Sequence, residues 1–207
     1  MSNNSLKFNL SKTELLCFAT SHPSRMLSSQ LLSCLNLSET VCRASVRNLG
    51  VEFDTQFSLN AHIRKTSAAC FSTLRALRKI LPLLPAESRA QVVQATVCSR
   101  LDYCNALFLG SPDYALRRLQ RVQSAAAKTV LCLPRSASSS GALAKLHWLP
   151  VAQRIVFKSL CLVYKALNNL GPSYLQSRFI KYLPSRSLHF SLLGLVHVPN
   201  VRRKRLG

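Results

Sequence analysis

The strongest constraint on the fold is an apolar repeat that takes on a helical period from Ser58 onward. Apolar side chains then recur at steps of three, four and seven residues, which places them on one face of an α-helix. The positions are Leu59, Ile63, Cys70, Leu74, Leu77 and Leu81. Ser58 is the expected N-cap and Pro82 marks the expected end. The pattern therefore predicts a long amphipathic helix over residues 58–81.

Similar patterns predict more helices downstream. One is expected after Pro85 and up to about Cys104, with Val93, Val97, Leu101 and Cys104 facing inward. The next begins with Ser111 as N-cap, Pro112 at the first helical position and Asp113 in the first turn, and it stops before Pro134. Its apolar face comprises Leu116, Leu119, Val122, Ala126 and Val130. After a Ser-rich link at 135–141, a helix is expected over 151–169 and a shorter one over 173–182.

The first part of the chain has a different character. Residues 6–18 end in a short apolar run that suits a strand. Residues 19–45 are Ser-rich and predict a loop or connector, while residues 46–54 alternate around Gly50 and predict a strand or a bent hairpin. The fold class expected for the whole chain is therefore mainly α, a helical bundle with a small β part at the N-terminus.

Charge points to a polyanionic partner. The chain has 28 Lys and Arg against 7 Asp and Glu, a formal net charge of +21, and no acid follows Asp113. Nucleic acid is the usual partner of such a surface, because phosphate contacts release condensed counterions. An anionic membrane surface is the second candidate. A solvated basic face with no ligand is the alternative to both.

The basic residues of two predicted helices fall into stripes. Within each stripe the side chains span no more than about 100° of the helix circumference, at about 100° per residue. The first stripe is Arg117, Arg118, Arg121 and Lys128, and the second is Arg154, Lys158 and Lys165. Such stripes suit a groove that follows a sugar-phosphate backbone without reading its sequence, although any amphipathic helix in an acid-poor protein would look similar. Residues 202–205 (RRKR) form a further basic cluster that resembles a nuclear-localisation or phosphate-binding segment.

The sequence contains no pattern that predicts a catalytic or metal site. The three aspartates, Asp54, Asp102 and Asp113, are widely spaced and no two are adjacent, whereas nucleotidyl transfer needs carboxylates that converge on magnesium ions. The eight cysteines include no C-x-x-C pair, so buried reduced thiols are expected in place of zinc ligands or disulfides. We expect no catalytic residue, no metal and no cofactor. Without a signal pattern or an apolar run of about 18 residues, we expect an intracellular protein of the nucleus or cytoplasm, neither secreted nor bound to a membrane.

Several short words resemble one protein family in its own order. Residues 9–14 (NLSKTE), 48–54 (NLGVEFD) followed by His62 and Ile63, 99–105 (SRLDYCN), 119–126 (LQRVQSAA) and 146–151 (LHWLPV) with Arg154 and Ile155 are similar to segments of LINE-type (non-LTR) retrotransposon reverse transcriptases. The resemblance implies a palm remnant with a primer-grip-like segment at 1–57, a helical thumb-like region at 58–135 and a post-thumb helical region with a basic tail at 136–207. The fingers, the aspartate-bearing motifs and the endonuclease are expected to be absent, as in a copy truncated at both ends.

The resemblance implies a reverse transcriptase fragment that contacts RNA or an RNA–DNA hybrid, as primer-template, without polymerase activity. The two cationic stripes are the positions assigned to that contact. Two alternatives stay open. The helical part could be a protein-interaction module, or the chain could be a retrotransposon-derived reading frame with no selected role.

Overall fold

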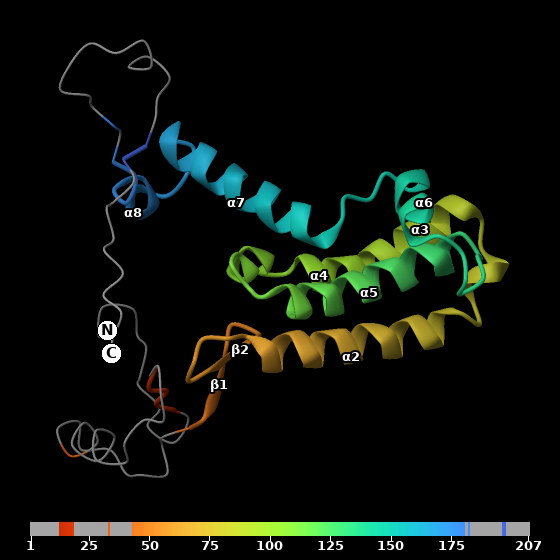
Figure 1. Cartoon of the computed structure of the whole chain (residues 1–207), viewed down its shortest axis with the longest axis horizontal. Helices are drawn as coiled ribbons and strands as arrows, with labels where there is room; N and C mark the ends of the chain where they lie inside the picture. Colours follow the sequence, from red (N-terminus) through yellow and green to blue (C-terminus); the bar gives the residue numbers. More distant parts are fainter. Residues whose placement is uncertain (1–12, 19–32, 34–42, 181, 183–195, 198–207) are drawn as a thin grey trace, which may run out of the picture. The chain divides into compact units, whose positions relative to one another are not determined.

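A computed structural model describes residues 13–18, 33, 43–180, 182 and 196–197 of the chain. These residues are mainly helical with one small two-stranded sheet, which confirms the expected fold class at this level. The chain divides into two compact units, residues 1–155 and 156–207, with the boundary inside one helix. The first unit runs across both boundaries expected from the sequence, at 57/58 and 135/136. Figure 1 gives the element labels used below.

The sheet is the hairpin expected around Gly50. Strand β1 (Ser45–Asn48) pairs antiparallel with β2 (Val51–Asp54), and Asn48 lies opposite Val51. Leu49 and Gly50 form the two-residue turn with φ of 46° and 83°, and tight hairpins of this kind need positive φ at both positions. The strand expected at 6–18 is not formed in its described part: residues 13–18 hold only an isolated bridge at Leu15, whose carbonyl accepts the Arg43 N–H at 2.9 Å.

Helix α2 (Asn60–Leu77) follows the hairpin, and it is shorter than expected at both ends. Ser58 does not take the N-cap position. Its N–H and hydroxyl donate to the Asp54 carboxylate, the N–H at 2.6 Å, while its Oγ accepts the Asn60 N–H at 3.3 Å from just outside the helix. The capping position passes to Leu59, which takes a left-handed φ of 56°. At the other end the helix gives way before Pro82 to a separate 3₁₀ turn, η4 (Leu81–Leu83).

The second helical stretch matches its expected limits. Helix α3 (Ala86–Val93), a π-helical turn η5 (Gln94–Cys98) and α4 (Ser99–Asp102) follow one another without a break. Val93, Val97 and Leu101 are buried as expected, while Cys104 is half-buried and left-handed, with φ of 51°. The stretch ends at Tyr103, which is extended, and the left-handed Cys104 then leads into a 3₁₀ turn, η6 (Asn105–Phe108).

Helix α5 (Asp113–Val130) has the expected inner face. Leu119, Val122, Ala126 and Val130 are buried, and Leu116 packs beside them half-buried. Its N-cap is Pro112 and not the expected Ser111, so the helix starts one residue later than the capping signal suggested. The Ser-rich link was also an incomplete prediction, since it contains the start of helix α6 (Ser139–Lys145), capped by the Ser138 hydroxyl.

The last two helices are α7 (Val151–Leu167) and α8 (Ser173–Gln176). The first ends two residues before the expected limit of 169, and the second covers only the beginning of the expected 173–182 segment. The basic run at 202–205 lies outside the described residues, as do residues 6–12 and 19–32 of the N-terminal predictions.

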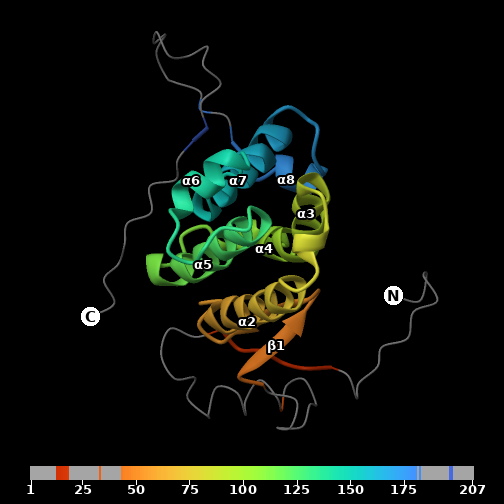
Figure 2. The ribbon, with the colours of Figure 1, turned by 90° about the vertical axis from the view of Figure 1, so that its right-hand side faces the viewer.

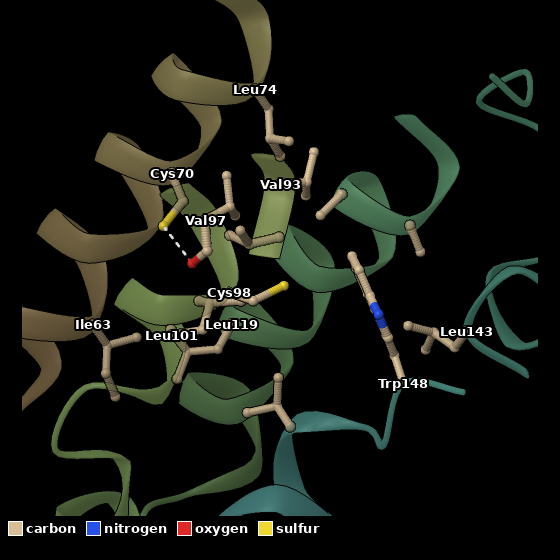
Figure 3. Packing of buried hydrophobic residues seen from close by; sticks show 14 of the residues in the cluster. Ile63, Cys70, Leu74, Val93, Val97, Cys98, Leu101, Leu119, Leu143 and Trp148 are labelled. Atoms are coloured by element: carbon tan, nitrogen blue, oxygen red, sulfur yellow. Dashed lines mark hydrogen bonds between the residues drawn. The ribbon is translucent and has the colours of Figure 1, made fainter. Parts of the chain in front are cut away.

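The core of the first unit lies between α2, the α3–η5–α4 stretch and α5 (Figures 1 and 2). Side chains of α2 and of the second stretch meet in Figure 3, where the Cys70 thiol lies 4.0 Å from the Val97 carbonyl oxygen. Leu119 from α5 is fully buried in the same cluster, and Trp148 packs near Leu143 at its edge. Each large apolar side chain buried in this way stabilises the fold by about 1.5–3 kcal/mol before entropy is counted.

Candidate nucleic-acid interface

Helices α2 and α5 lie side by side, as both ribbon views show. The amide of Asn60 at the start of α2 donates to the Tyr114 hydroxyl oxygen at the start of α5, at 2.9 Å. Farther along, the two helices form the walls of a groove of about 1160 Å³. The turn after α2 and the segment after α5 line the same groove, so it is built entirely within the first unit.

Within the part of the chain that the structure describes, six cationic side chains line this groove, and no Asp or Glu does. They come from three segments: Arg75 and Arg78 from α2; Arg117, Arg121 and Lys128 from α5; and Arg135 from the segment that follows α5. All are exposed except Lys128, which is half-buried. Like charges gathered around one concavity raise its potential, because the low-dielectric walls focus the field. The groove is therefore suited to an anion with several charges.

Apolar side chains lie in the groove among the cations. Phe71 and Leu74 reach it from α2, Ala125 from α5, and Leu133 and Pro134 from the segment after α5. Leu74 is buried, whereas 37% of Phe71 is exposed. An open aromatic ring among arginines gives the groove an apolar surface as well as charge, which a purely electrostatic patch would not have.

The segment after α5 is held in place at one end of the groove. The Lys128 ammonium donates to the Arg135 carbonyl oxygen at 2.8 Å. Arg89 from α3 donates through Nη1 to the Cys132 sulfur at 2.6 Å, where Cys132 takes a left-handed φ of 52°. These two contacts hold the backbone of the segment that carries Arg135 beside the groove.

The stripe expected on α5 is only partly a groove surface. Arg117, Arg121 and Lys128 line the groove, while Arg118 is exposed and is not among the lining residues. Arg75, Arg78 and Arg135 also line the groove, although neither predicted cationic stripe includes them. Arg75 and Arg78 stand four and seven residues after Phe71, a spacing that puts all three on one side of α2, but that spacing alone does not show which helix faces them.

The second stripe has a different setting. Arg154 donates through Nη1 to both carboxylate oxygens of Asp102 on α4, at 3.0 and 2.8 Å. The Arg154 side chain is only 25% exposed, so its charge serves an ion pair inside the first unit. Lys158 and Lys165 lie on α7 in the second unit, and both are exposed.

The residues of the family-like words mostly contact one another. The Tyr103 hydroxyl donates to the Leu49 carbonyl oxygen at 2.5 Å, which joins α4 to the hairpin turn. The side chain of Gln123, fully buried on α5, donates to the Leu149 carbonyl oxygen at 2.8 Å. Gln120 accepts the Val151 N–H at 2.9 Å and so holds the start of α7. These side chains fix how the segments pack, and only Gln120 also lines the groove.

His62 occupies another such contact. Its Nδ1 accepts the Glu52 N–H at 3.4 Å, and its ring stacks on Phe108 with centroids 6.0 Å apart. Burial lowers the pKa of His62 below its usual value, against the opposing attraction of Glu52. The hydrogen bond from Lys65, at 2.5 Å, lowers the pKa of Glu52 in turn. The neutral imidazole is thus part of the junction between β2 and α2.

The aspartates and cysteines have structural surroundings. Asp54 binds Ser58, Asp102 pairs with Arg154, and Asp113 opens α5. Across the described part of the chain, no three His, Cys, Asp or Glu side chains are grouped so that they could hold a metal ion. Among the cysteines that the structure describes, Cys70, Cys98, Cys104, Cys132 and Cys161 are free thiols, and burial raises the pKa of Cys98 to about 11. Cys34 and Cys42 lie outside the described residues.

Comparison with known proteins adds no relative: no family model, no curated protein and no solved structure matches the chain. Within the described residues, none of the helices has both the length and the apolar character needed to cross a bilayer.

Proposed function

We propose that this protein binds nucleic acid through the groove between α2 and α5, by contacts to the phosphate backbone. One observation carries the proposal: six Lys and Arg side chains from three segments surround one concavity whose lining holds no acid. Phosphate oxygens are natural partners of arginine, whose guanidinium binds them in a bidentate manner. Because these contacts reach the backbone and not the base edges, binding is independent of sequence.

Two further observations support the same proposal. The formal net charge of +21 favours association with any polyanion. The words that resemble LINE-type reverse transcriptases also point to a nucleic-acid partner, and our proposal for the origin of the chain is a thumb-containing fragment of such an enzyme. The proposal includes no polymerase activity, because Asp54, Asp102 and Asp113 stand on three separate elements, where two of them bind Ser58 and Arg154.

The test removes charge from the groove and compares it with equal removal elsewhere. The groove variant carries Arg75→Gln, Arg117→Gln and Arg121→Gln, three exposed lining cations. The control variant carries three substitutions to Gln at exposed cations outside the groove lining, Arg47, Arg64 and Lys145. Binding of a fluorescent oligonucleotide is followed by anisotropy, with circular dichroism to establish that both variants fold.

Each phosphate contact to a single strand adds about 0.7 to the slope of log K against log salt, and so contributes about 0.7 of a logarithmic unit of affinity at about 100 mM salt relative to about 1 M. If each of the three side chains contacts one phosphate, the groove variant should therefore bind about 100-fold more weakly at about 100 mM salt. The control variant should lose no more than a few-fold, because its charges act only at a distance. Equal losses in the two variants would show that net charge alone drives binding and would contradict a groove site.

A second candidate function is supported by helix α7. Val156, Phe157, Leu160 and Tyr164 are 47–63% exposed, and their spacing places them on one broad face of the helix. Exposed apolar side chains grouped in this way are typical of protein-interaction surfaces. Self-association that persists at high salt in sedimentation experiments would favour this function. A monomer at both low and high salt would show that α7 does not bind a second copy of the chain.

A further inference from the structure

The groove combines two chemistries that a nucleic-acid duplex cannot use together. A duplex presents phosphates on its outside and keeps the faces of its bases stacked within. The cations of the groove could contact those phosphates, but the accessible parts of Phe71 and Leu133 would then meet only charged or hydrated groups. Placing charge against apolar surface costs free energy unless that charge is paired. The apolar part of the groove therefore selects against a fully paired ligand.

An unpaired strand satisfies both parts of the groove. Its bases have free apolar faces that stack on aromatic rings, while its backbone carries one charge per nucleotide. Phe71 is the only aromatic side chain among the residues that line the groove, and it is partly exposed there. Arg75 and Arg78 stand on the same side of α2 as Phe71, and Arg117 and Arg121 face the groove from α5. A base that stacks on Phe71 thus has cations on both sides for its flanking phosphates.

We infer that the groove binds single-stranded nucleic acid, with an unpaired base stacked on Phe71 and the flanking phosphates held by the arginines of α2 and α5. The inference rests on the proposed function, since it specifies which form of nucleic acid the groove takes. An acidic amphipathic helix is the other ligand with matching charge and apolar content. A helix would bury its apolar side chains over the whole length of the groove, whereas a stacked base depends on one ring.

The experiment compares a short fluorescent oligothymidylate with the same strand annealed to oligoadenylate, using the full chain and three variants of one residue. Phe71→Ala removes the ring, Phe71→Leu keeps apolar volume without a π face, and Phe71→Trp enlarges the ring. Phe71 is more than a third exposed, so these variants should fold, and thermal unfolding verifies it.

We expect the full chain to bind the single strand more tightly than the duplex. Phe71→Ala should weaken single-strand binding about 5- to 100-fold, the usual effect of losing one stacked base, and should leave duplex binding within about two-fold. Phe71→Leu should lose nearly as much as Phe71→Ala, whereas Phe71→Trp should retain or raise the affinity. The salt dependence should be the same in all of them, because no phosphate contact is removed.

Three results would overturn the inference. The first is tighter binding of the duplex, and the second is full affinity of Phe71→Leu for the single strand. The third is displacement of the oligonucleotide by an acidic amphipathic peptide that binds more tightly than the oligonucleotide does. Each of these leaves salt-dependent nucleic-acid binding intact. Failure of the proposed function is recognised separately, because neither the single strand nor the duplex would then bind in a salt-dependent manner.

Discussion

Arg154 belongs to a predicted nucleic-acid-binding stripe, but in the structure it forms an ion pair with Asp102. It can therefore be tested whether Arg154 stabilises the fold or contacts phosphate. In the structure Arg154 Nη1 bridges both carboxylate oxygens of Asp102, at 3.0 and 2.8 Å, and the two side chains are 25% and 37% exposed. We therefore expect Arg154→Gln to reduce the stability of the first unit and to leave nucleic-acid binding unchanged.

The magnitude follows from the partial burial of the pair. Exposed ion pairs contribute about 0–1 kcal/mol, whereas breaking a fully buried pair costs about 3–5 kcal/mol. A pair between these limits predicts a loss of about 1–2 kcal/mol for Arg154→Gln, because the part-buried Asp102 carboxylate loses the charge that offsets its desolvation. For a unit of this size that corresponds to a fall in Tm of about 2–8 °C.

The assay is a double-mutant cycle on chemical or thermal unfolding, with Arg154→Gln, Asp102→Asn and the double variant. The coupling free energy should be about 1 kcal/mol, so the double variant loses less than the sum of the single losses. The same Arg154→Gln protein is then titrated with the oligonucleotide at several salt concentrations. An unchanged Tm, together with a salt slope shallower by about 0.7, would refute the structural role and identify Arg154 as a phosphate contact.

Three further outcomes test the core and the titrating groups. Leu119→Ala should cost about 2–5 kcal/mol of unfolding free energy in denaturant titrations, because the side chain is fully buried between helices; a loss below about 1 kcal/mol would show that this site is not packed. Cys98, whose pKa burial raises to about 11, should be alkylated far more slowly near neutral pH than the exposed Cys132, as mass spectrometry of the native protein would show; equal rates would contradict its burial. The lowered pKa of His62 means that the unfolded chain takes up a proton more readily than the folded one, so stability should fall as the pH drops below about 6.5. His62→Gln should weaken this dependence, while the lowered pKa of Glu52 predicts a separate loss of stability below pH 4.5; a pH dependence near 6 that His62→Gln leaves intact would assign it elsewhere.

The helical elements were predictable because periodicity is a local property. The apolar faces of α2 and α5 are read directly from residue spacing, and Leu119 is buried as its place in the repeat indicated. The helix starts were less predictable, because capping depends on the competing partners of a side chain. Ser58 has the right chemistry for an N-cap, but it lies one residue before the capping position, where it is bound to Asp54.

The groove itself could not be predicted from spacing, because it requires knowing that α2 and α5 are neighbours. Arg75 and Arg78 are recognised as groove residues only once α2 is seen to lie beside α5. Arg117 and Arg121 were predicted from the sequence because they share one helix face. Arg154 was predicted to face nucleic acid because of its place in a helical stripe, but it pairs with Asp102. Asp102 stands 52 residues away in the sequence, so the spacing within one helix could not predict this contact.

The salt dependence of nucleic-acid binding by the full chain tests the central claim most directly. Six lining cations, each contacting one phosphate of a single strand, predict a slope of log K against log salt of about −4, or roughly a 300-fold loss of affinity between about 50 and 200 mM salt. The variant with Gln at 75, 117 and 121 should show about half that slope. An affinity that is flat with salt, or a slope that this variant leaves unchanged, would contradict a nucleic-acid site in the groove.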